Sequence, residues 1–242
     1  MEENMKKLVI AVCLLAAITI GGSGCMFESL YKHEDTPTPN RLALNYMEEK
    51  YGETFTYAAP CGNSLSGTRE LLVTCNSFPD RQILVQIENF KSDNRIYRDN
   101  YLAVKYESET LEFFRSCASD FYEKCNVFYE APTQVQSEKL TAESNFDAFL
   151  SDGLTTIVVL FELPANEFSD PAQVEHIISN ICASCSNANV TVVIVEDQIW
   201  NTFSRTELAD RISNDDFVAL AKAYIRNSST DVRWYGEGVA NG

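Results

Sequence analysis

The sequence predicts an α+β protein in which a mixed β-sheet is backed by helices. Three observations lead to this prediction. Residues 82–89 alternate with period two, as in a strand with one well-buried face. Residues 109–123 carry an apolar stripe at helical spacing. Residues 190–195 are apolar throughout, which is typical of a central strand covered on both faces.

The first half of the body is predicted to follow the order α-β-β-β-α-β. Asn40 is a favourable N-cap, and Gly52 can end the helix that follows it. The later elements of this half are expected near residues 53–59, 69–75, 82–89, 109–123 and 126–130.

The second half is predicted to alternate helix and strand. A long helix begins with Asp170 as N-cap and Pro171 as first helical residue. Ser204 and Glu207 have capping-box spacing, and Ser213 repeats it with Asp216, so a helix is expected after each serine. The second of these carries an apolar pattern through Tyr224. The other elements are expected near residues 145–151, 155–162, 190–195 and 232–235.

Residues 40–242 are expected to form a single body. The segment 131–144 is polar and lacks periodicity, so it is the best internal boundary if the body has two lobes.

Composition excludes some partners. The 242 residues include 19 Lys and Arg against 35 Asp and Glu, a net charge of −16. A nucleic-acid-binding protein needs a basic face to neutralise phosphates, so this class is not expected. Electrostatic docking on anionic lipid is disfavoured for the same reason.

Residues 1–24 have the layout of a secretory signal peptide. Lys6 and Lys7 precede the apolar run Leu8–Ile20, and small residues follow. As a helix this run spans about 20 Å, short of the roughly 30 Å hydrocarbon core of a membrane. The acidic residues before Lys6 leave either Met1 or Met5 as the start.

Ser23, Gly24 and Cys25 resemble the lipobox of bacterial lipoproteins, although Gly22 stands where that motif has an aliphatic residue. The resemblance implies a lipidated Cys25 on the outer face of the bacterial cytoplasmic membrane. Ordinary cleavage and secretion is the alternative, because Gly22 and Gly24 also suit a small-x-small site. Residues 25–39 are expected to be an extended tether. The body resembles uncharacterised lipoproteins of Gram-positive bacteria, a likeness of class without functional residues.

Two catalytic motifs are weighed and set aside. The loop from Gly62 to Gly67 matches the start of a phosphate-binding loop, but Thr68 stands in place of its lysine and a strand is predicted next. Serine and cysteine hydrolases usually need an imidazole base. His33 lies in the tether, and His176 falls on the solvated side of its helix. No catalytic residue is therefore assigned.

Six cysteines lie in the body: Cys61, Cys75, Cys117, Cys125, Cys182 and Cys185. Cys182 and Cys185 form a CxxC pair at a helix C-terminus. The helix dipole raises a thiol pKa there, whereas redox CxxC motifs use a helix N-terminus. A buried structural role is expected for both.

One set of carboxylates is a candidate metal site. Glu162 ends one predicted strand, and Glu196 and Asp197 follow another. If helices connect these strands, they are parallel, and their carboxyl ends lie on one edge of the sheet. Oxygen ligands of this kind suit Ca²⁺ or Mg²⁺. Trp200 is a candidate aromatic wall for a ligand at the same edge.

The leading hypothesis is a non-enzymatic surface lipoprotein that binds a small ligand, a cation or an envelope partner. The first alternative is an envelope hydrolase that uses carboxylates alone. The second is a structural partner in an envelope assembly.

Overall fold

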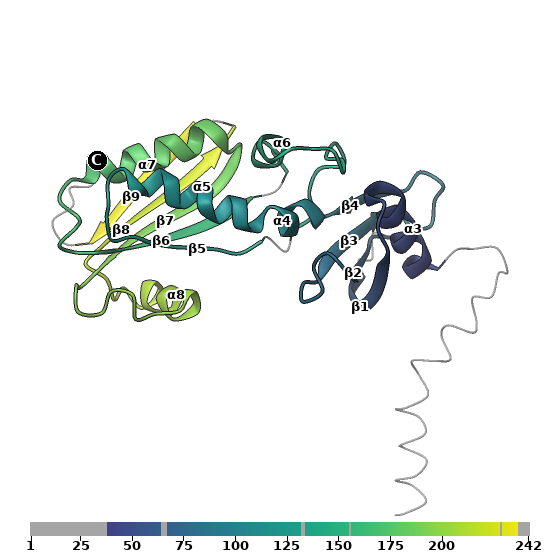
Figure 1. Ribbon diagram of the computed structural model, residues 1–242, viewed down its shortest axis with the longest axis horizontal. Helices are drawn as coiled ribbons and strands as arrows, with labels where there is room; N and C mark the ends of the chain where they lie inside the picture. The colour runs from purple at the N-terminus through teal and green to yellow at the C-terminus, as the bar shows by residue number, and fades with distance from the viewer. Residues whose placement is uncertain (1–37, 64–66, 132–133, 155, 228, 237–242) are drawn as a thin grey trace, which may run out of the picture. The chain divides into compact units, whose positions relative to one another are not determined.

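The computed structural model describes residues 38–63, 67–131, 134–154, 156–227 and 229–236. The chain starts with helix α3 (Pro39–Tyr51) and continues into an antiparallel sheet with strand order β1-β2-β3-β4. Helix α3 packs against this sheet (Figure 1). The strands are β1 (Phe55–Asn63), β2 (Arg69–Cys75), β3 (Ile83–Glu88) and β4 (Ile96–Asp99).

The predicted order of the first half is confirmed, with one strand and one short helix added. Strands β1 and β2 pair antiparallel, so the segment after Gly62 joins two strands and does not lead into a helix. The additional strand is β4, which pairs with β3 through Asp99 opposite Val85. With four residues, two of them Arg98 and Asp99, β4 is too short and too polar for its periodicity to be recognised.

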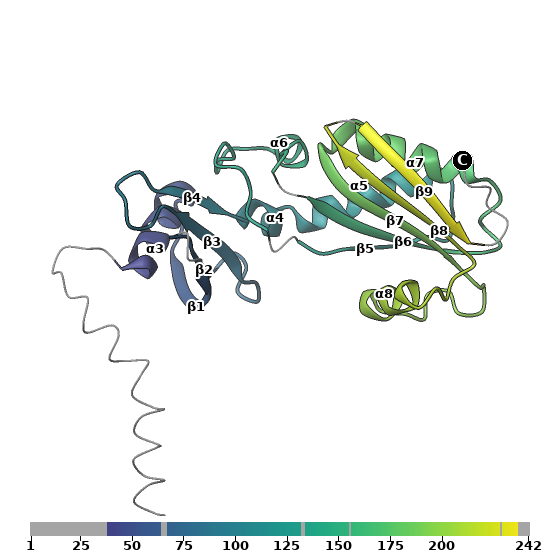
Figure 2. The same ribbon diagram turned by 180° about the vertical axis from the view of Figure 1, so that it is seen from behind.

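Helices α4 (Tyr101–Lys105) and α5 (Glu107–Ser119) lead from the first sheet to the second. The change between sheets therefore lies before segment 131–144, the expected boundary. The second sheet has the order β5-β6-β7-β8-β9, with β6 and β7 parallel and every other pair antiparallel (Figure 2). Its strands are β5 (Asn126–Tyr129), β6 (Ile157–Pro164), β7 (Asn187–Val195), β8 (Ala219–Arg226) and β9 (Ser229–Gly236).

The helices of the second half are α6 (Phe146–Leu150), α7 (Pro171–Ser184) and α8 (Arg205–Ser213). Two start as predicted. The Asp170 carboxylate accepts a hydrogen bond from Ala172 N at 2.9 Å, with Pro171 in the first turn of α7. Ser204 and Glu207 form a reciprocal capping box at the start of α8.

The predicted helix after Ser213 is wrong, because Ala219–Arg226 is strand β8. Its alanines favour helix in isolation. In the fold this segment pairs with β7 on one side and β9 on the other, and these two ladders outweigh local propensity. The alternation of buried Ala221 and Ala223 with the more exposed Lys222 and Tyr224 is the period-two signal.

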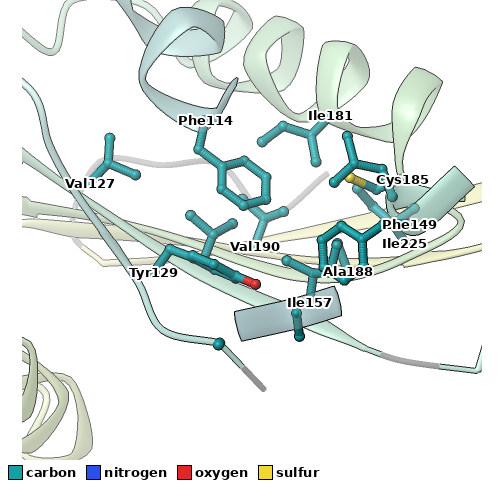
Figure 3. Packing of buried hydrophobic residues seen from close by; sticks show 14 of the residues in the cluster. Phe114, Val127, Tyr129, Phe149, Ile157, Ile181, Cys185, Ala188, Val190 and Ile225 are labelled. Carbon is teal, nitrogen blue, oxygen red and sulfur yellow. The ribbon is translucent and has the colours of Figure 1, made fainter. Parts of the chain in front are cut away.

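The main core of the second half lies between one face of its sheet and helices α5 and α7 (Figure 3). Phe114 from α5 and Ile181 from α7 are completely buried there, over Val190 of β7. Each fully buried side chain of this size contributes about 1.5–3 kcal/mol relative to an exposed one. Helices α5 and α7 therefore cover most of this face of the sheet.

In the first half, a buried carboxylate holds α3 to the end of β4. Asp99, with a side chain only 1% exposed, accepts hydrogen bonds from Lys50 Nζ at 2.7 Å, Tyr46 Oη at 2.8 Å and Tyr51 Oη at 2.7 Å. Its Oδ1 also accepts from Tyr101 N at 2.9 Å. Burial and the Asp99 charge raise the pKa of both tyrosine hydroxyls, so they remain protonated donors.

Replacing Asp99 with alanine is expected to lower the free energy of unfolding by about 3–5 kcal/mol, because it leaves the Lys50 ammonium buried without its counter-charge. Urea denaturation followed by circular dichroism measures this loss. Asp80→Ala is the control, since Asp80 is exposed and its replacement should change stability by less than about 0.5 kcal/mol. Equal effects of the two substitutions would contradict the role given to Asp99.

Candidate binding face on the second sheet

Helix α8 lies on the side of the second sheet opposite α5 and α7 (Figures 1 and 2). It covers a smaller core in which Leu208 of α8 is completely buried over Val193 and Leu220. Partly buried side chains from the loops around α8 complete this core, namely Ile199, Trp200, Phe203 and Phe217. This cover extends over only part of that side of the sheet.

The uncovered part, here called the open face, follows from the strand register. Val158, Asn189, Tyr224 and Asp231 are successive partners across β6, β7, β8 and β9. In the next row Thr191, Lys222 and Arg233 are partners in the same way. Paired residues point to the same side of a sheet, so these side chains share one surface. The open face also includes Arg226 and Tyr235, which alternate with the core-facing residues of β8 and β9.

Apolar surface gathers on the open face. Among the described residues five large hydrophobic side chains are exposed, and three of them lie here: Val158 at 40%, Tyr224 at 45% and Tyr235 at 43%. Scattered single exposures of this kind are ordinary, whereas a group on one surface is typical of a binding site.

The open face is also basic. Lys222, Arg226 and Arg233 lie on two neighbouring strands of a chain whose net charge is −16. Asp231 pairs with Arg233, with 2.7 Å between the carboxylate and Nη2. Lys222 Nζ lies 5.6 Å from the centre of the Tyr235 ring. Among the described residues, neither Lys222 nor Arg226 forms an ion pair with a carboxylate.

A shallow groove of about 380 Å³ runs along the hairpin end of this surface. Six residues line it: Tyr224, Arg226, Ser229, Thr230, Asp231 and Arg233. The set offers an aromatic ring, hydroxyl groups, the guanidinium of Arg226, and the guanidinium of Arg233 paired with the Asp231 carboxylate. It can hold an anionic group by charge-assisted hydrogen bonds while the ring contacts an apolar part of the same ligand.

Sequence reasoning missed the open face because it placed a helix over residues 213–224. In a helix, Tyr224 would not lie on the side shared by Lys222 and Arg226, since residues two apart do not face each other. In a strand they do. The alternation of small apolar residues with these longer side chains is the signal that reveals the surface.

The predicted parallel pairing of the two strands that carry the acidic residues is confirmed, but the register separates the carboxylates. Glu162 pairs with Val193, three residues before Glu196, which is about 10 Å along a strand. Among the described residues, no group of three His, Cys, Asp or Glu side chains is arranged to hold a metal ion. A Ca²⁺ or Mg²⁺ site at this edge stays a prediction from the sequence.

Each of the three carboxylates has a partner of its own. Glu162 is completely buried and accepts hydrogen bonds from Asn126 Nδ2 at 2.8 Å and Asn201 N at 3.3 Å. Asp197 accepts from Asn166 N at 2.8 Å, and Glu196 accepts from Gln198 Nε2. These bonds tie the loop after β7 to neighbouring segments.

Trp200 lies next to this network and packs in the smaller core under α8. Its indole Nε1 is buried and has no hydrogen-bond partner in the described part of the chain. Asn201, the residue after Trp200, donates to Glu162, while the Trp200 ring itself packs against the core under α8; its role as an aromatic wall for a ligand stays a prediction.

His176 is exposed on α7 and lies against the Phe121 ring, with 5.2 Å between the ring centres. All six body cysteines are free thiols. Cys185 is buried as expected, and Cys182 is partly buried. Burial raises the pKa of the Cys185 thiol to about 12 and that of Cys117 to about 11, which suppresses the reactive thiolate.

Thiol labelling tests this assignment. Iodoacetamide at about pH 8 is expected to modify exposed Cys61 in the native protein within minutes, while Cys185 and Cys117 react only after denaturation. Peptide mass spectrometry reads out each site. Fast native labelling of Cys185, or a disulfide between Cys182 and Cys185, would contradict the structural role.

The signal peptide, the candidate lipidation residue Cys25 and most of the tether lie outside the described residues. Within the described residues, no helix is both long enough and apolar enough to cross a membrane.

No family model matches the chain, and no curated protein matches it. A solved structure of a DUF5037 family protein from Ruminococcus gnavus aligns with a TM-score of 0.41 and 11% identity, covering 80% of this chain and 94% of that one.

Proposed function

We propose that this protein is a non-enzymatic binding protein held on the outer face of the bacterial cytoplasmic membrane by a lipidated Cys25. Its open face binds a ligand that carries a carboxylate or phosphate group. The observation on which this rests is the pair Lys222 and Arg226, two basic side chains without a carboxylate partner in the described residues, placed beside exposed Tyr224.

The basic side chains of the open face act locally. A chain with an excess of 16 negative charges repels anions at long range, but such repulsion is screened beyond about 8 Å at physiological ionic strength. A fixed group of basic side chains therefore acts on a ligand that is already in contact. Hydrogen bonds from a charged donor contribute about 1.5–3 kcal/mol each.

Titration of the full chain with inorganic phosphate and, separately, with citrate tests the proposal. At least one anion is expected to raise the melting temperature at low salt. Lys222→Ala and Arg226→Ala should each weaken the apparent affinity about tenfold or more, the loss of one charge-assisted hydrogen bond. The two titrations distinguish phosphate from carboxylate recognition.

Arg115→Ala is the matched control. Arg115 is an exposed arginine on α5, on the other side of the sheet, and its guanidinium lies 3.9 Å from Glu112. Its replacement changes the net charge equally and should leave anion binding unaltered. Absence of stabilisation by both anions, or an equal loss in Arg115→Ala, would overturn the assignment of the open face.

The anchor is tested separately. Cys25→Ser is expected to block lipid attachment, so that the protein leaves the membrane fraction or accumulates as its unprocessed form. Detergent phase partitioning and intact mass measure both outcomes. Cys61→Ser serves as the control for loss of a single thiol. Unchanged partitioning of Cys25→Ser, with an unmodified wild-type mass, would rule out the lipoprotein assignment.

A further inference from the structure

The edges of the two sheets differ in how they are protected. Among the described residues four strands lie at edges: β1, β4, β5 and β9. Strands β4 and β5 have only four residues each. Strand β1 is longer, but it contains Pro60 and two irregularities in its register. Short length, proline and bulges are the usual devices that prevent an edge from pairing with another chain.

Strand β9 has none of these three devices. Its eight residues pair with β8 in an uninterrupted register, from Ser229 opposite Arg226 to Gly236 opposite Ala219. In the described chain no strand pairs with its other side (Figure 1). In an antiparallel ladder, the residues that do not bond to one neighbour direct their N–H and C=O groups to the other. About half of the backbone groups of β9 therefore point outward.

Charge is the one device that β9 does carry. Asp231 and Arg233 lie on the open face, two residues apart and of opposite sign. An added strand that places a like charge beside either of them is disfavoured. The charges of β9 therefore favour a partner strand with an acidic and a basic residue in the complementary positions. A second, antiparallel copy of β9 has this arrangement.

We propose that two copies of this protein pair through β9, antiparallel about a two-fold axis at Val232, to form one continuous ten-stranded sheet. The axis is perpendicular to the sheet, so the open faces of both copies lie on the same side. Asp231 of each copy then lies opposite Arg233 of the other.

The charge pattern singles out this register. A two-fold axis at Asp231 would place two carboxylates opposite each other, and an axis at Arg233 would oppose two guanidinium groups. Only the axis between them, at Val232, produces two ion pairs, and it also aligns Ser229 with Tyr235 across the interface. Half-buried Val232 and Trp234, on the side of α7, gain cover from the second strand.

This pairing is inferred from the unpaired edge of β9 and from the charges of Asp231 and Arg233, and it does not depend on anion binding. Sedimentation equilibrium of the full chain, purified in density-matched detergent, is expected to show a dimer. Asp231→Arg carries two positive charges on β9, and Arg233→Asp carries two negative charges. Each variant alone is expected to be monomeric, because every cross-pair opposes like charges. An equimolar mixture of the two should dimerise again, because each supplies the charge that the other needs.

Far-ultraviolet circular dichroism measures whether both variants are folded. The matched control is Arg115→Glu, a charge reversal at an exposed arginine of α5 that leaves β9 and its cross-strand neighbours unchanged and should remain dimeric. A monomeric wild type at about 100 μM overturns the proposal, as does dimerisation of either charge variant alone. Failure of the mixture to dimerise also overturns it, because that result would mean that each substitution acts within its own chain and not across the interface.

Discussion

The parallel pairing of β6 with β7 is the constraint on which the second half depends. A parallel pair requires a crossover, and α7 supplies it by returning over one face of the sheet. Helix α5 joins α7 on that face, and their apolar stripes close it. Helix α8 alone serves the opposite face. This unequal cover leaves one side of β8 and β9 exposed.

Most of the fold could be predicted from the sequence, because most elements carry their own signal. Asp170 with Pro171 marks the start of α7, and the apolar residues of β7 mark a central strand. Strand β8 could not be recognised in this way. Its alanines have high helix propensity, and only the ladders on both sides make it a strand. That error hid the open face, because Tyr224 shares a surface with Lys222 and Arg226 only in the extended conformation.

The carboxylate edge shows a second limit of sequence reasoning. The sequence places Glu162 and Glu196 at the ends of adjacent parallel strands, and the pairing agrees. The strand register decides whether the two carboxylates meet. A shift of three residues along β6 and β7 separates the two groups, and Asn126 and Asn201 occupy the space around Glu162. Neither the offset nor these distant partners can be read from strand ends alone.

The position of Asp99 has a mechanical consequence. For a chain held at Cys25, any pull from the membrane would enter the body at Pro39, the first residue of α3. Lys50 and Tyr51, which bind Asp99, lie in the last turn of that helix. A load applied at Pro39 would therefore peel the helix from its first turn and reach the buried ion pair last. The Lys50–Asp99 ion pair would therefore be the last of these contacts to carry the load, and it would pass that load directly to β4 of the first sheet.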